Sequence, residues 1–194
     1  MELPALDDID NTMSTLLINI ANGIGTLTLN RPQLKNALDS SMRDALREAI
    51  QSIRADRSMH AIVICGKENN FCAGGDINSK NVVDAQAGRE RIDDSHEWIG
   101  TLLDLDRPVI AAVDGVAFGT GFSLALLAED LVFTARELDA DEAKQLGVAF
   151  EIVHQQTLHA RAQQLAEHLA NTSPAAFGCQ DVRSLKGKRA GIDV

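Results

Sequence analysis

The chain has 194 residues, of which 45% are apolar, 24% charged and 4% aromatic, a composition typical of one compact domain. Its net charge of −10 argues against a basic nucleic-acid-binding surface, and its longest apolar runs are too short to cross a membrane. Three cysteines without metal-ligand spacing, and an acidic start without the features of a signal peptide, favour a reduced, cytoplasmic compartment. We therefore expect no nucleic-acid partner, no membrane span and no bound metal.

The N-terminal region, after an acidic lead-in over residues 1–14, carries a hairpin signal followed by a helix signal. Two runs with strand character, 15–20 and 24–29, flank the turn dipeptide Asn22-Gly23 and predict a β-hairpin. Apolar residues at helical spacing then predict an amphipathic helix over 38–53. Ser41 and Asp44 form a candidate variant capping box near the start of this helix.

The rest of the chain continues the alternation of strand and helix. Short apolar runs predict further strands at 61–65, 109–113 and 131–135. Amphipathic or apolar helices are expected over 89–103 and 122–128, the first ending before Arg107-Pro108. Strands that alternate with helices indicate an α/β core.

Two glycine segments are the candidates for chemistry. The first, Phe71–Ile77, follows a buried strand, and the second, Gly119-Thr120-Gly121, opens a helix that follows another. Glycine admits backbone conformations that bring N–H groups close to a ligand. If the two segments face each other, two backbone N–H groups converge on one developing oxyanion. The other interpretation of each segment is a turn that satisfies packing.

Three ordered segments together resemble one family. Residues 30–38, 71–77 and 107–121 are similar to the motifs of the crotonase superfamily, the enoyl-CoA hydratase/isomerase family, and residues 138–148 are similar to its stretch ahead of the C-terminal helices. The resemblance implies an α/β fold, a crotonase-like spiral of ββα units with a C-terminal helical segment. It also implies an acyl-CoA-binding core over 15–137 and an oligomerisation segment over 138–194.

The family chemistry supplies the functional expectation. The resemblance implies an enzyme of lyase or isomerase type that acts on an acyl-CoA thioester through an enolate held by two backbone N–H groups. The resemblance further implies that a coenzyme A thioester is the substrate and that no prosthetic group is needed. The expected assembly is a homotrimer or a dimer of trimers.

The resemblance also assigns residues by position. The oxyanion donors would be the backbone N–H groups of Ala73 and Thr120, and Arg31 and Lys35 are the cations expected to offset the repulsion between an acidic chain and the CoA phosphates. Asp76 would contact the pantetheine arm or buttress its loop. The positions expected to bind substrate are Lys35, Asn36, Ala37, Ala73, Gly74, Gly75, Asp76, Ile77 and Gly119.

The sequence departs from the family pattern at Ser123. Hydratases of this family carry a glutamate there, and serine cannot act as a general base at neutral pH without a partner base. Double-bond isomerisation with a single acid is therefore favoured over hydration. The alternative is a non-catalytic acyl-CoA-binding or assembly subunit that keeps the fold.

A second departure lies at Glu137-Leu138, where relatives continue with a segment that contains their second acid. Either the chain lacks this segment or residues were left out of the sequence because they were not observed. A true deletion of roughly fifty residues would uncover apolar strands at a cost of about 25 cal/mol per Å², which favours the second explanation.

Overall fold

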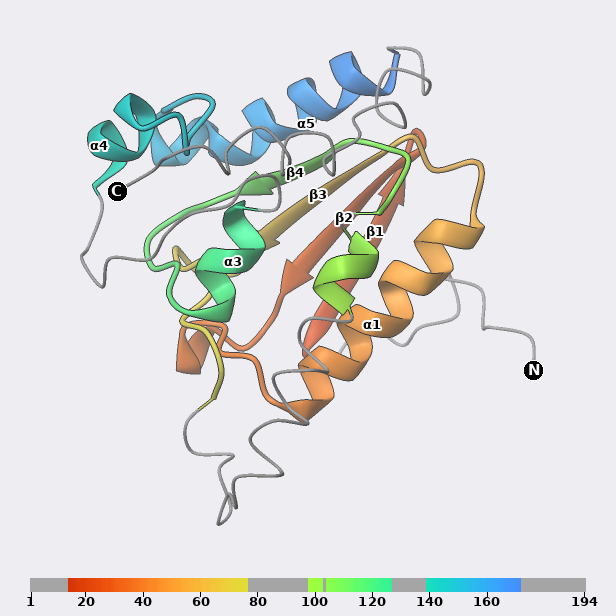
Figure 1. The fold of residues 1–194 in the computed structure, drawn as a ribbon, viewed down its shortest axis with the longest axis horizontal. Helices are drawn as coiled ribbons and strands as arrows, with labels where there is room; N and C mark the ends of the chain where they lie inside the picture. The colour runs from red at the N-terminus through yellow and green to blue at the C-terminus, as the bar shows by residue number, and fades with distance from the viewer. Residues whose placement is uncertain (1–13, 77–97, 103, 127–138, 172–194) are drawn as a thin grey trace, which may run out of the picture.

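The sheet is the scaffold on which the rest of the molecule is built (Figure 1). A computed structural model describes residues 14–76, 98–102, 104–126 and 139–171. Four strands pair in the order β1-β2-β3-β4, with β1 and β2 antiparallel and the other neighbours parallel. Their bounds are Leu16–Ala21, Ile24–Leu29, Ala61–Gly66 and Val109–Ala112. The predicted hairpin and both following strands are confirmed, and the predicted strand at 131–135 lies outside the described residues.

The hairpin turn shows why its sequence specifies it. Asn22 and Gly23 have φ of 53° and 74°, as a type I′ turn requires, and these residue types tolerate positive φ. The turn sets a register in which Leu16 lies opposite Leu29. Leu16, Leu27 and Leu29 are buried, so one face of the hairpin points into the core.

Three helical segments cover that face of the sheet. They are α1 (Ser40–Ala55), residues 98–102 and α3 (Thr120–Leu126), whose apolar residues join one core cluster with β1, β2 and β3. Helix α1 begins differently from the prediction: its N-cap is Asp39, whose carboxylate accepts from the Met42 N–H at 2.8 Å. The predicted capping pair is therefore wrong, because Ser41 and Asp44 already lie inside the helix.

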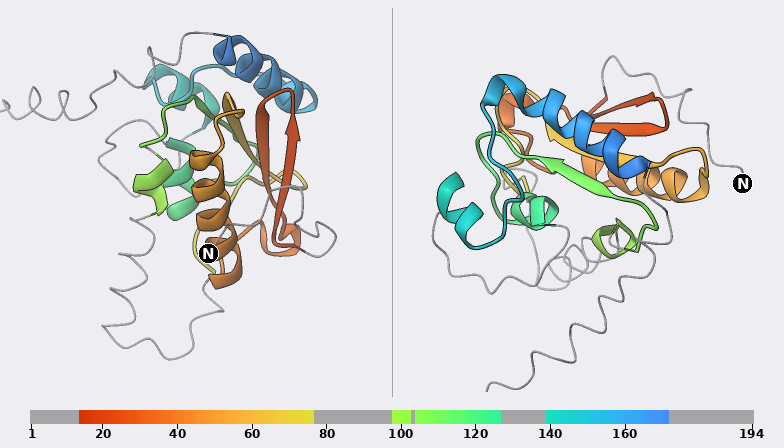
Figure 2. Two further views of the ribbon diagram at one scale, coloured as in Figure 1. Left: turned by 90° about the vertical axis from the view of Figure 1, so that its right-hand side faces the viewer. Right: turned by 90° about the horizontal axis from the view of Figure 1, so that it is seen from above.

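The opposite face of the sheet is covered by α5 (Leu158–Ala170), as the view from above in Figure 2 shows. Ala162 and Ala166 of α5 belong to the second core cluster, together with Val63 and Cys65 of β3. Strand β3 is buried along its whole length because it is covered on both faces. Two short elements, α4 (Ala140–Gln145) and the 3-10 turn η3 (Gln155–Thr157), precede α5. Within the described residues, no helix is long and apolar enough to cross a membrane.

Candidate functional site

The two glycine segments meet at one edge of the sheet. Because β3 and β4 are parallel neighbours, the segments that follow them leave from the same edge. There the Cys72 N–H donates to the Val116 carbonyl at 2.8 Å, and the Phe118 N–H donates to the Cys72 carbonyl at 2.9 Å. Cys72 and Ala117 form an isolated parallel bridge. The expectation that the two segments face each other is thus confirmed.

Contact between the segments is close enough to require glycine. Gly74 has φ of 87°, and a Cβ on it would lie 2.6 Å from the Phe118 carbonyl oxygen. A Cβ on Gly121 would lie 2.8 Å from the Cys72 sulfur and closer still to the Cys72 carbonyl oxygen. A side chain at either position would push the segments apart.

This contact leaves two backbone donors available. Among the described residues, neither the Gly75 N–H nor the Thr120 N–H has a hydrogen-bond acceptor. Gly75 is exposed, with open space where a Cβ would lie, and Thr120 is the first residue of α3. Ala73, the other donor expected from sequence, is already engaged: its N–H donates to the Lys35 carbonyl at 2.9 Å. Within the part of the chain that the structure describes, Gly75 rather than Ala73 therefore keeps an N–H without an acceptor in the first glycine segment.

Three positions of the turn over residues 31–38 are expected to bind substrate, and only one of their side chains is exposed. Lys35 is exposed, whereas Asn36 is 0% and Ala37 8% exposed. The Asn36 side chain accepts from the Arg31 N–H at 2.9 Å and donates to the carbonyls of Lys67 and Asn70 at 2.9 and 2.6 Å. Asn36 is therefore a structural residue, because these contacts use both ends of its amide.

The Asp76 carboxylate is held inside the protein by an ion pair. Asp76 is buried, and its carboxylate accepts from the Arg31 guanidinium at 2.9 Å. Arg31 also pairs with Asp39 at 3.3 Å and is only 13% exposed, so its charge is matched within the protein. Ile77 lies outside the described residues.

Four further residues differ in how deeply they are buried: Ser123, Cys72, Trp98 and Phe118. Ser123 is half-buried, and its hydroxyl donates to the Gly119 carbonyl at 3.4 Å. Burial raises the pKa of the Cys72 thiol to about 11, so this residue packs as a neutral thiol. Trp98 is 1% exposed and belongs to the core, whereas Phe118 is 72% exposed beside the glycine contact. Sequence reasoning missed the Gly75 donor, and residue types carry no signal that distinguishes it from Ala73.

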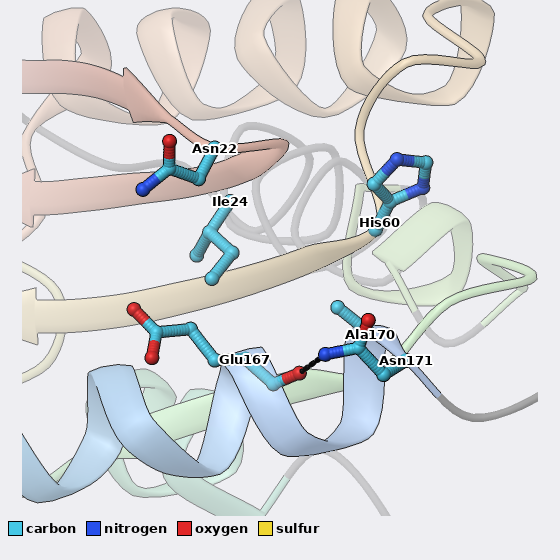
Figure 3. A pocket seen from close by; sticks show the side chains of 6 residues that line it. All are labelled: Asn22, Ile24, His60, Glu167, Ala170 and Asn171. Atoms are coloured by element: carbon cyan, nitrogen blue, oxygen red, sulfur yellow. Dashed lines mark hydrogen bonds between the residues drawn. The ribbon is translucent and has the colours of Figure 1, made fainter.

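A separate hollow lies at the other end of β3 (Figure 3). Its volume is about 350 Å³, and it is bounded by the hairpin turn, the start of β3 and the end of α5. The residues that line it are Asn22, Ile24, His60, Glu167, Ala170 and Asn171. None of the predicted site residues lines this hollow. Among the described residues, no group of three or more histidine, cysteine or acidic side chains is placed to hold a metal.

A family profile matches more than half of the chain. The profile is that of enoyl-CoA hydratase/isomerase, and the match covers residues 19–133, which include both glycine segments. This chain belongs to the enoyl-CoA hydratase/isomerase family. The resemblance to the crotonase superfamily is thereby confirmed.

Two curated relatives carry the names of different activities. A 1,2-epoxyphenylacetyl-CoA isomerase of Escherichia coli K12 is 29% identical over 212 residues, which cover 86% of this chain and 80% of the relative. A Rhizobium meliloti protein described as "Probable enoyl-CoA hydratase" is 30% identical, with 89% and 82% covered. The first alignment is longer than the whole chain of 194 residues, so the relative contains residues without a counterpart here.

Two solved structures share the fold. Pseudomonas aeruginosa DspI superposes with a TM-score of 0.81 at 23% identity, covering 94% of this chain and 91% of that structure. An enoyl-CoA hydratase from Bacillus anthracis superposes with a TM-score of 0.80 at 20% identity, covering 93% and 85%. The predicted crotonase-like α/β fold is confirmed.

Proposed function

We propose that this protein binds an acyl-CoA thioester and holds its carbonyl oxygen between the N–H groups of Gly75 and Thr120. The observation that carries the proposal is the close contact of the two glycine segments, which leaves both donors without an acceptor among the described residues. Unpaired N–H groups that a ligand can reach are available to donate to it, and such bonds strengthen when the bound ligand excludes water. A thioester oxygen is the acceptor on which the family acts.

Two such donors acidify the carbon next to the thioester carbonyl. Negative charge that develops on the oxygen when a proton leaves this carbon is stabilised by fixed N–H dipoles, which need no reorganisation during the reaction. Removal of one donor of this kind lowers the rate about 10²- to 10³-fold in enzymes with comparable sites. The backbone supplies the stabilisation, so the β-branched side chain of Thr120 does not preclude the role.

Among the family reactions, we propose double-bond isomerisation rather than hydration. Isomerisation of a 3-enoyl thioester moves one proton from the α-carbon to the γ-carbon through a dienolate, with no net addition, so a single acid–base group that takes up this proton and returns it is sufficient. Hydration requires in addition an activated water molecule, and Ser123 holds the position where hydratases carry a glutamate. Its hydroxyl donates to the Gly119 carbonyl, and no base among the described residues is seen to accept its proton.

The second candidate function is acyl-CoA binding without turnover. It is favoured by Ser123 and by the length of the alignment with the relative, which exceeds the chain. This alternative requires that the chain truly lacks the family residues between Glu137 and Leu138, and mass spectrometry would then find a tryptic peptide that reads continuously from Glu137 to Lys144. A longer intervening sequence would return the catalytic acid to the chain and remove this alternative.

We further propose a homotrimer or a dimer of trimers in the cytoplasm. Support for an oligomer comes from apolar side chains that are exposed within the 138–194 segment: Leu146 at 55%, Phe150 at 73% and Ile152 at 43%. Sedimentation velocity at micromolar concentration tests the assembly. A monomer would contradict this part of the proposal and leave the thioester site unaffected.

Thr120→Pro is the sharpest test of the oxyanion site. Thr120 is the first residue of α3, a position that tolerates proline, so the substitution removes the N–H with little cost to the helix. Thr120→Ala is the matched control, because it keeps the N–H. We expect Thr120→Pro to lose about 10²-fold or more of 3-enoyl-CoA isomerisation, and Thr120→Ala to lose little. Equal activity of both variants, or rapid hydration of 2-enoyl-CoA with 3-enoyl-CoA untouched, contradicts the proposed mechanism.

A further inference from the structure

We propose that Arg31 is a positioning residue of the thioester site, which aims the Gly75 N–H, and not a contact for the CoA phosphates. The inference rests on the proposed function of Gly75 and Thr120. It reverses the role that charge alone assigns to Arg31, which is to neutralise the anionic substrate.

Arg31 makes three directed contacts with three segments of the chain. Its guanidinium donates to the Ala37 carbonyl at 2.6 Å and to the Asp76 carboxylate at 2.9 Å. Its Nε lies 3.3 Å from the carboxylate of Asp39, the N-cap of α1. One planar group thus connects the turn over 31–38, the first glycine segment and the start of α1, and the fork geometry of arginine suits such a junction.

Those contacts hold a short parallel pairing in place. Besides the bond from Ala73 to Lys35, the Leu38 N–H donates to the Gly74 carbonyl at 2.7 Å and the Asp76 N–H donates to the Leu38 carbonyl at 2.9 Å. In a parallel pairing, the residue between two bonded neighbours directs its own N–H away from the partner strand. Gly75 is that residue, so its N–H faces outward. Arg31 contacts both sides of this pairing, through Ala37 and Asp76.

The phosphate role fits Lys35 better than Arg31. The Arg31 side chain is 13% exposed and lies between the carboxylates of Asp39 and Asp76, so its charge is already matched. Lys35 is exposed on the same turn and, within the part of the chain that the structure describes, takes part in no ion pair. Substitution of Lys35 is therefore expected to weaken binding only of a thioester that carries the CoA phosphates, whereas substitution of Arg31 is expected to act whether or not the phosphates are present.

A comparison of two thioesters separates the two roles. The probe is 4-dimethylaminocinnamate attached either to CoA or to pantetheine, which lacks the phosphates. Its absorption moves to longer wavelength when the thioester oxygen accepts hydrogen bonds, so the shift reports the donors without turnover. The variants are Arg31→Gln, Arg31→Lys and Lys35→Gln, with Arg57→Gln as control, because Arg57 is 80% exposed and follows the far end of α1.

We expect both Arg31 variants to lose most of the spectral shift at saturation with both thioesters. Lys35→Gln is expected to keep the shift and to weaken binding about tenfold for the CoA thioester alone, and Arg57→Gln is expected to match the wild type. If Arg31→Gln weakens binding only of the CoA thioester and keeps the full shift, Arg31 contacts phosphate and the proposal is overturned. A wild-type protein that shifts neither probe overturns the proposed function itself.

The same samples are used to check that the variants are folded. Arg31→Gln removes the guanidinium that pairs with the buried Asp76 carboxylate, so the double variant Arg31→Gln/Asp76→Asn removes the carboxylate charge as well. Trp98 is the sole tryptophan and is buried, so its fluorescence reports the folded core. A folded double variant that retains the wild-type spectral shift overturns the proposal, and one that loses the shift supports it.

Discussion

Gly121 packs directly against Cys72 where the two glycine segments meet. A Cβ on Gly121 would lie 2.7 Å from the Cβ and 2.8 Å from the sulfur of Cys72. We therefore expect Gly121→Ala to force α3 away from the first segment and to destabilise the fold by about 1–3 kcal/mol, as overpacked cores do. Thioester binding should weaken with it, because the distance between the two donors is set by this contact.

Gly75→Ala is the matched control, since open space surrounds the position of its Cβ and its φ is not in the left-handed region. Thermal unfolding followed by Trp98 fluorescence measures the stability of both variants. The spectral shift of the bound thioester measures their substrate site. If Gly121→Ala and Gly75→Ala behave alike, close packing on Cys72 does not define the site.

Asn36 is expected to be essential for stability and not for substrate contact. Its side chain is fully buried and bonds three backbone groups of Arg31, Lys67 and Asn70, at a residue with φ of 55°. Asn36→Ala leaves those groups unpaired and places alanine in a left-handed conformation, so a loss of about 3 kcal/mol is expected. Asn36→Gly relieves the backbone strain and should recover part of the loss. The exposed neighbour Gln33→Ala is the control in urea unfolding, and equal stability of the Asn36 and Gln33 variants would exclude the structural role.

The fold was predictable because its signals are local. Asn22-Gly23 specifies the hairpin turn, and the apolar run over 61–65 becomes a strand covered on both faces. The roles of Asn36 and Ala73 were not predictable, because they depend on which segments pair in space. A motif aligned by position places Ala73 at the site, but its N–H donates to the Lys35 carbonyl, and the donor that we propose instead, Gly75, is two residues further along.

Arg107 is a structural residue that sequence reasoning used only as a helix boundary. It is 7% exposed, and one of its nitrogens donates to the carbonyls of Ile53, Asp56 and Met59 at 3.0, 2.7 and 3.0 Å. It therefore satisfies carbonyl groups at and beyond the C-terminus of α1.

Arg107→Met keeps the length of the side chain and removes its donors, so a loss of about 3 kcal/mol in the free energy of unfolding is expected. Arg57→Met removes an exposed cation paired with Asp106 at 2.7 Å, and should cost less than about 1 kcal/mol. Urea unfolding of both variants measures these two losses in the free energy of unfolding. A small loss for Arg107→Met would mean that water replaces its contacts.

Because Cys65 and Cys72 are buried, we expect the free energy of unfolding to decrease at alkaline pH. Burial raises the pKa of Cys72 to about 11, above its ordinary value of 9.0, and burial also raises the pKa of Cys65. A thiol whose pKa is higher in the folded state stays protonated there while the unfolded chain ionises. For Cys72 this contribution is therefore fully present below about pH 9 and is lost as the pH rises towards 11, at about 1.4 kcal/mol per pH unit.

Cys72→Ala isolates this effect from the ionisation of other groups. We expect the free energy of unfolding of the wild type to fall more steeply between pH 9 and 10.5 than that of the variant, by roughly one thiol's slope. Both thiols should also resist alkylation in the folded protein at pH 8, because the neutral thiol is a poor nucleophile and both sulfurs are buried. Parallel slopes in the two proteins, or rapid native-state labelling of Cys72, would show that this thiol is accessible to water and does not fill the contact between the glycine segments.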